Sequence, residues 1–151
     1  MSLPELHARF ANTAILYFIF MGIWGYYRFF RKEGLNDSYW GAVVIGEVFL
    51  FIEAGIGTYM WIIGLRPGRD IHLLYGSVSL MVLPMVYMFT KGRPGRPEIL
   101  MYATTFFFGA GLLFRALGTG KDALPSIIPD AFFPLFDTLV QVFSSLPGMF
   151  S

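Results

Sequence analysis

The sequence contains no cysteine and few charged residues. Of its 151 residues, 14% are Asp, Glu, Lys or Arg, against roughly 25% in a typical soluble protein. The lack of cysteine excludes disulfides, Fe–S clusters, thiol catalysis and zinc sites built on thiolates. The formal net charge of +1 provides no basic surface for a nucleic acid, so we expect no nucleic-acid partner.

Apolar residues, by contrast, are abundant. Hydrophobic side chains make up 56% of the chain and aromatic side chains 19%, and the mean hydropathy is +0.61. A soluble domain of this length could not bury so many apolar side chains, because much of its surface has to remain polar. The composition therefore predicts a multi-pass integral membrane protein in contact with the lipid bilayer.

Four segments are long and apolar enough to cross a membrane. The clearest are residues 10–27 and 71–90, which contain no Asp, Glu, Lys or Arg. Runs rich in Pro and Gly, such as RPGRD at 66–70 and KGRPGRP at 91–97, mark turns between the segments. Short connections force neighbouring helices to be antiparallel. The sequence therefore predicts an all-α, up-down bundle of four membrane helices over residues 1–117, with helices at about 5–31, 38–65, 70–90 and 97–117.

The remaining residues, 118–151, differ in character. Prolines at 125, 129 and 134 interrupt the chain, and apolar residues then recur at helical spacing from Phe132 to Phe143. We expect a linker followed by a C-terminal amphipathic helix at the membrane interface. It carries Asp130 and Asp137 and no Lys or Arg, which favours docking against a partner subunit over binding to anionic lipid.

The distribution of positive charge predicts the orientation. Four spans place both termini on the same side of the membrane. The densest basic clusters, Arg31-Lys32 and the loop at 91–97, lie on the opposite side. Because basic loops are usually cytoplasmic, we expect both termini on the non-cytoplasmic side.

The chain contains two histidines, His7 and His72, and both stand at the start of a predicted helix on the same side. In an antiparallel bundle, two such imidazoles could face each other across a flat ring, as bis-histidine haem b requires. Arg115, near the same end of the fourth helix, would suit a haem propionate, with Arg9 or Arg69 as further candidates. The alternative is that both histidines are ordinary interfacial residues at helix starts.

Two carboxylates, Glu47 and Glu53, fall within the second predicted span. An unpaired ionised carboxylate in a membrane costs several kcal/mol, so such a group is usually protonated, paired or functional. The two side chains are about 240° apart around a helix, so we predict neither a metal-binding pair nor an acid–base dyad. A proton relay or a hydrogen bond to quinone is one interpretation. A protonated Glu that bonds to a neighbouring helix or subunit is the other.

The first and third predicted helices each open a helical hairpin, and each begins with a histidine. These two hairpins and the run His72-Leu73-Leu74-Tyr75-Gly76 resemble small four-helix membrane proteins of the cytochrome b561-like group, loosely over residues 1–117. That group usually has histidines at both membrane faces, whereas this chain has both on one side. The resemblance therefore implies at most one haem b, ligated by His7 and His72. Gly76, one turn from His72, would leave room for the edge of the macrocycle.

Two functions are compatible with these features. The first is a non-catalytic accessory subunit of a larger, bioenergetic membrane complex, in contact with other subunits or in a homo-oligomer. The sparse reactive residues and the small loops favour it. The alternative is a single-haem b membrane cytochrome that transfers electrons, including exchange with quinone. We find no motif of a hydrolytic or metal-dependent enzyme, so we expect no catalytic activity of the chain's own and no protein-only metal site.

Overall fold

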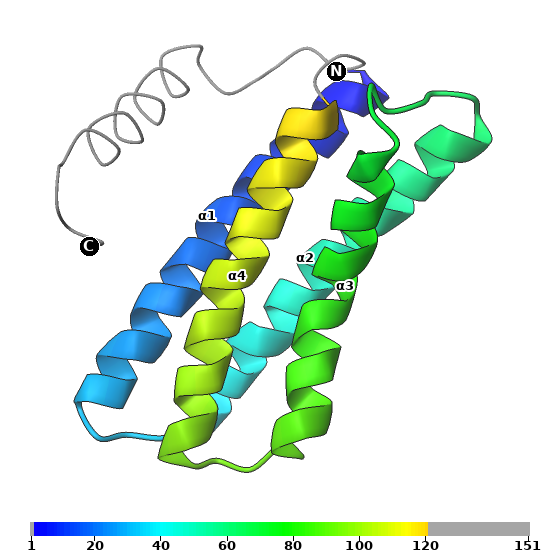
Figure 1. Ribbon diagram of the computed structural model, residues 1–151. Coiled ribbons are helices and arrows are strands. Elements are labelled where there is room, and N and C mark those ends of the chain that lie inside the picture. Colours follow the sequence, from blue (N-terminus) through cyan, green and yellow to red (C-terminus); the bar gives the residue numbers. More distant parts are fainter. Residues whose placement is uncertain (1, 121–151) are drawn as a thin grey trace, which may run out of the picture.

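Four helices form an up-down bundle in the computed structural model, which describes residues 2–120 (Figure 1). They are α1 (Leu3–Phe30), α2 (Asp37–Ile62), α3 (Ile71–Thr90) and α4 (Arg96–Gly120). All four are long and apolar enough to cross a membrane, and the described residues contain no strand. The predicted all-α, multi-pass class is thus confirmed. The predicted C-terminal amphipathic helix lies outside the described residues.

The helix ends follow from local chemistry. Ser2 and Glu5 form a capping box at the start of α1, in which the Ser2 N–H donates to the Glu5 carboxylate at 2.8 Å. Asn36 caps α2 by accepting a hydrogen bond from the Tyr39 N–H at 2.9 Å. The helix α2 ends at Ile62, before the predicted 65, because Gly64 adopts a φ of +89° that a helix cannot continue through.

The helices surround the bundle axis in the order α1, α2, α3, α4, so α1 and α3 are diagonal. The most extensive contact is between α1 and α4, and the least extensive is between α2 and α3. Glycine allows the close approach of α1 to α4, since a Cβ added at Gly25 would lie 2.7 Å from the Cβ of Ala103. The start of α1 and the end of α4 lie at the same end of the bundle, which we call the N-terminal end (Figure 1).

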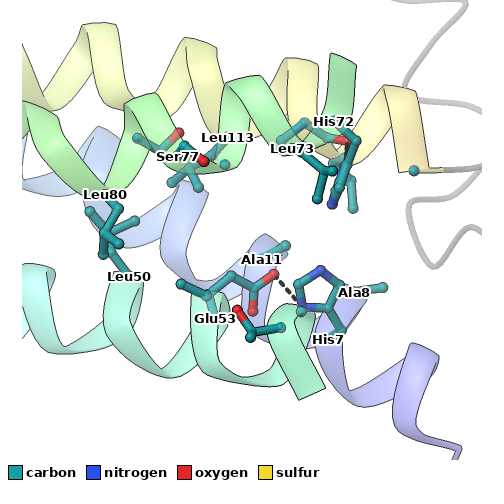
Figure 2. Close-up of a pocket in the computed structure, with 18 of the residues that line it drawn as sticks. His7, Ala8, Ala11, Leu50, Glu53, His72, Leu73, Ser77, Leu80 and Leu113 are labelled. Carbon is teal, nitrogen blue, oxygen red and sulfur yellow. Dashed lines mark hydrogen bonds and ion pairs between the residues drawn. The ribbon is translucent and has the colours of Figure 1, made fainter. Parts of the chain in front are cut away.

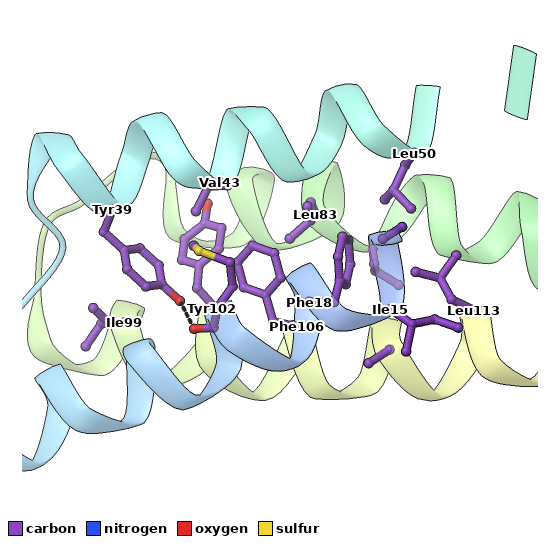
Figure 3. Close-up of a cluster of buried hydrophobic side chains, with 14 of the residues drawn as sticks. Ile15, Phe18, Tyr39, Val43, Leu50, Leu83, Ile99, Tyr102, Phe106 and Leu113 are labelled. Carbon is purple, nitrogen blue, oxygen red and sulfur yellow. Dashed lines mark hydrogen bonds between the residues drawn. The ribbon is translucent and has the colours of Figure 1, made fainter. Parts of the chain in front are cut away.

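Large aromatic side chains fill the other half of the bundle (Figure 3). Phe18 and Phe106 pack edge to face with ring centroids 4.9 Å apart. The hydroxyl of Tyr39, which is fully buried, donates to the backbone carbonyl of Met21 at 3.0 Å. Because this core is tightly filled, the unfilled space lies toward the N-terminal end.

Candidate functional site

A cavity of about 420 Å³ lies between the helices at the N-terminal end. This volume is within the range of about 300–1,000 Å³ that is usual for ligand and cofactor sites. All four helices contribute to its wall, and nine of the nineteen lining residues are Gly, Ala or Ser. These small side chains leave a gap between the helices.

The cavity is open on one side. Its exposed lining residues all belong to α2 and α3, namely Thr58, Trp61, Leu73 and Ser77. The lining residues of α1 and α4 are buried or half-buried. The opening therefore lies between α2 and α3, the pair with the least extensive contact.

The two histidines meet in this cavity. His7 extends from the second turn of α1 and His72 from the first turn of α3, and their ring centroids are 6.0 Å apart with an angle of 70° between the ring planes. Figure 2 shows the two imidazoles pointing toward each other. The structure thus brings together, across the bundle diagonal, two residues that are 65 positions apart in the sequence (72 − 7).

His7 lies against α2. Its Nδ1 is 3.0 Å from Oε1 of Glu53, at ion-pair distance but without the angles of a good hydrogen bond, and both side chains are buried. Gly57 allows this position, since a Cβ added there would lie 3.3 Å from Cε1 of His7. A carboxylate beside one ring nitrogen is the usual way to orient a ligand histidine, and it leaves Nε2 for the ligand.

His72 lies against α4. Its Nδ1 is 2.8 Å from the carbonyl oxygen of Ala116. A carbonyl oxygen can only accept a hydrogen bond, so Nδ1 of His72 must carry the proton. In the neutral ring, Nε2 is then the nitrogen with a free lone pair. Nδ1 of each histidine therefore faces an oxygen atom of a neighbouring helix.

Glu53 reaches His7 because the register between α1 and α2 is fixed farther along the bundle. Tyr39 bonds to the carbonyl of Met21, and the Tyr17 hydroxyl donates to the carbonyl of Ala42 at 2.6 Å. Residue numbers rise along one antiparallel helix as they fall along the other, so residues at the same level have a nearly constant sum. That sum is about 60 for both of these pairs, and it is 60 for His7 and Glu53, so all three pairs share one register. The spacing of six residues places Glu53 on a different helix face from Glu47, but no pattern in the sequence links Glu53 to His7.

Four of the residues predicted for function do not line the cavity, namely Arg9, Arg69, Arg115 and Glu47. Arg115 is exposed, and its guanidinium carbon lies 5.7 Å from the ring centroid of Tyr75 rather than among the lining residues. Glu47 does not line the cavity either, and both its carboxylate oxygens are buried without a hydrogen-bond partner among the described residues. The separation of the two carboxylates, predicted from their spacing, agrees with this arrangement.

The described side chains at this site do not form a ligand set for a bare metal ion. Within residues 2–120, no group of three or more His, Cys, Asp or Glu side chains is placed to hold one. The cavity therefore offers two imidazole nitrogens and an otherwise mainly apolar wall.

No protein-family model matches the chain, and neither a curated protein nor a solved structure is similar to it. The resemblance to cytochrome b561-like proteins therefore stays a prediction. The fold and the site define a four-helix membrane bundle with a paired-histidine cavity at one end.

Proposed function

We propose that the protein is a membrane cytochrome that binds one haem b between His7 and His72. The observation that carries this proposal is the spacing of the two rings, whose centroids are 6.0 Å apart across a cavity. Two imidazoles bound to opposite sides of one metal ion have centroids about 6 Å apart, because each metal–nitrogen bond is about 2 Å long and each nitrogen lies about 1 Å from its ring centre.

The contacts at Nδ1 support the same assignment. Ligand histidines usually bind a carboxylate or a backbone carbonyl through the nitrogen that does not face the metal. His7 has the carboxylate of Glu53 in that position and His72 has the carbonyl of Ala116. An ordinary interfacial histidine has no need of such a partner, because water satisfies both of its nitrogens.

The donor set and the wall also fit haem. Two ligands are too few for a bare metal ion, but they are what a haem iron requires, since the porphyrin supplies the other four nitrogens. Leu50, Leu80 and Leu113 line the inner end of the cavity with apolar side chains. When bound, haem b supplies one-electron transfer.

The accessory-subunit hypothesis stays a prediction. The described helices expose many large aliphatic and aromatic side chains, which contact with lipid tails already requires. The two hypotheses are compatible, because a haem-binding chain can also be a subunit of a larger assembly. The paired histidines favour haem binding as the property to test first.

The test is an absorption spectrum of the full-length protein, produced with haem available and purified in mild detergent. We expect a Soret band and, after reduction with dithionite, a sharp α band. His7→Ala and His72→Ala should each abolish the low-spin spectrum, and added imidazole should restore it in part by filling the vacated space. A folded wild-type protein without a Soret band would contradict the proposal. A haem spectrum that survives both substitutions would contradict the ligand assignment.

A further inference from the structure

The N-terminal end of the bundle carries four exposed arginines, Arg9, Arg66, Arg69 and Arg115. None of them forms an ion pair with another described residue. The ion pairs of Arg28, Arg31 and Arg93 all lie at the opposite end, in or beside the short loops. The end that holds the cavity therefore presents four guanidinium groups without an ion-pair partner among the described residues.

Arg66 differs from the other three because it is attached to the cavity wall. Its guanidinium carbon lies 3.7 Å from the ring centroid of Trp61, which is close cation–π contact. Trp61 lines the cavity and is 37% exposed, so it stands at the rim. Arg115 stacks instead on Tyr75, which is not a lining residue.

Stacking leaves the hydrogen-bonding edge of Arg66 unused. The contact with Trp61 engages the flat face of the guanidinium, whereas its five N–H groups lie in the plane of the group. Arg66 makes no hydrogen bond or ion pair with the other described residues. The indole of Trp61, a lining residue, thus holds a guanidinium with unused N–H donors beside a mainly apolar cavity that Arg66 itself does not line.

A ligand that fits this site has an apolar body and an anionic edge. The inner wall is formed by leucines, and the positive charge of Arg66 lies over Trp61 at the rim. An arginine fork matches a carboxylate with two parallel hydrogen bonds. The carboxylate would therefore lie at the rim and the rest of the ligand between the helices.

We propose that Arg66, stacked on Trp61, binds a carboxylate of the cavity ligand. For haem b, which rests on the function proposed above, that group is a propionate. Arg66 then takes the role that the sequence analysis gave to Arg115. Trp61 would act as a positioning residue, since it lines the cavity and holds the guanidinium of Arg66 beside the rim.

The experiment compares rates of haem loss from the full-length protein to an excess of a haem-scavenging protein. We expect Arg66→Gln to accelerate haem loss about tenfold, the effect of one charge-assisted hydrogen bond near a surface, with the bis-histidine spectrum unchanged. The matched control, Arg115→Gln, removes the same charge at the same end and should change the rate less than twofold. Haem dimethyl ester, which has no carboxylate, should leave wild type and Arg66→Gln at equal rates.

Each result decides the question. Equal acceleration by both substitutions, or a larger one by Arg115→Gln, would overturn the assignment to Arg66. An effect of Arg66→Gln that persists with the dimethyl ester would show that Arg66 acts on the protein and not on a carboxylate. If wild type binds haem through both histidines and Arg66→Gln loses it at the normal rate, this inference alone fails. A wild-type protein that binds no haem overturns the proposed function together with it.

Discussion

Gly76 offers a way to close the cavity without disturbing the bundle. It lines the cavity one turn along α3 from His72, and a Cβ added there would meet no atom within 4 Å. Gly76→Leu should therefore fill empty space with four carbon atoms. Because leucine is a better helix former than glycine, we expect the haem-free protein to keep its fold and its stability.

The effect on haem binding follows from the same geometry. If the edge of the macrocycle occupies the space beside Gly76, the leucine side chain overpacks the complex. Overpacking costs about 1–3 kcal/mol, which corresponds to a dissociation constant raised about 5- to 150-fold. The substitution touches neither imidazole nor their partners Glu53 and Ala116.

Titration of haem into the haem-free protein in detergent micelles, followed at the Soret band, measures this change. The matched control is Gly111→Leu on α4, where an added Cβ also meets nothing within 4 Å but the residue does not line the cavity. It should bind haem as wild type does. Undiminished affinity in Gly76→Leu, with both variants folded by circular dichroism, would refute the placement of the ligand in this cavity.

Two further predictions concern the helix contacts and the environment of the ligand. Gly25→Ala should lower the free energy of unfolding by about 1–3 kcal/mol, because its Cβ would meet that of Ala103 at 2.7 Å; chemical denaturation in detergent measures this. Gly41→Ala, where space is open, is the control and should be neutral, and equal costs would argue against the observed α1–α4 approach. Glu53→Gln keeps the side-chain size but removes a carboxylate 3.0 Å from His7, so the haem midpoint potential should rise in a spectroelectrochemical titration. An unchanged potential would show that Glu53 does not act on the ligand through His7.

The helices could be predicted from the sequence because their signals are local. Uninterrupted apolar runs and Pro-Gly turns identify α1 to α4 with only small errors at the ends, such as the early end of α2 at Ile62. The pairing of His7 with His72 was stated as one of two alternatives, since a bundle with short loops restricts which helix ends can meet. The sequence does not determine whether the first and third helices are adjacent or diagonal, and the structure makes them diagonal.

Rotation and register could not be predicted. Glu53 reaches His7 through contacts of Tyr17 and Tyr39 several turns away, and no local pattern encodes that alignment. The position of Arg115 near the end of α4 predicts a contact with a haem propionate, but the rotation of α4 directs its side chain to Tyr75. Arg66 could not be predicted as a donor, because its position depends on the contact of its guanidinium with the ring of Trp61. Trp61 lies near the end of α2 and Arg66 in the loop that follows.

The closure of the bundle by α1 against α4 has a consequence for biogenesis. The first and last described helices form its most extensive contact, so this contact cannot form until α4 has left the translocation machinery. His7 lies in α1, whereas the carbonyl that orients His72 lies near the end of α4, at Ala116. A ligand that needs the complete cavity would therefore bind after all four helices have packed, and the opening between α2 and α3 is the route that the exposed lining residues indicate. A ribosome-bound chain that ends before α4 would present the histidines without the wall that makes them a site.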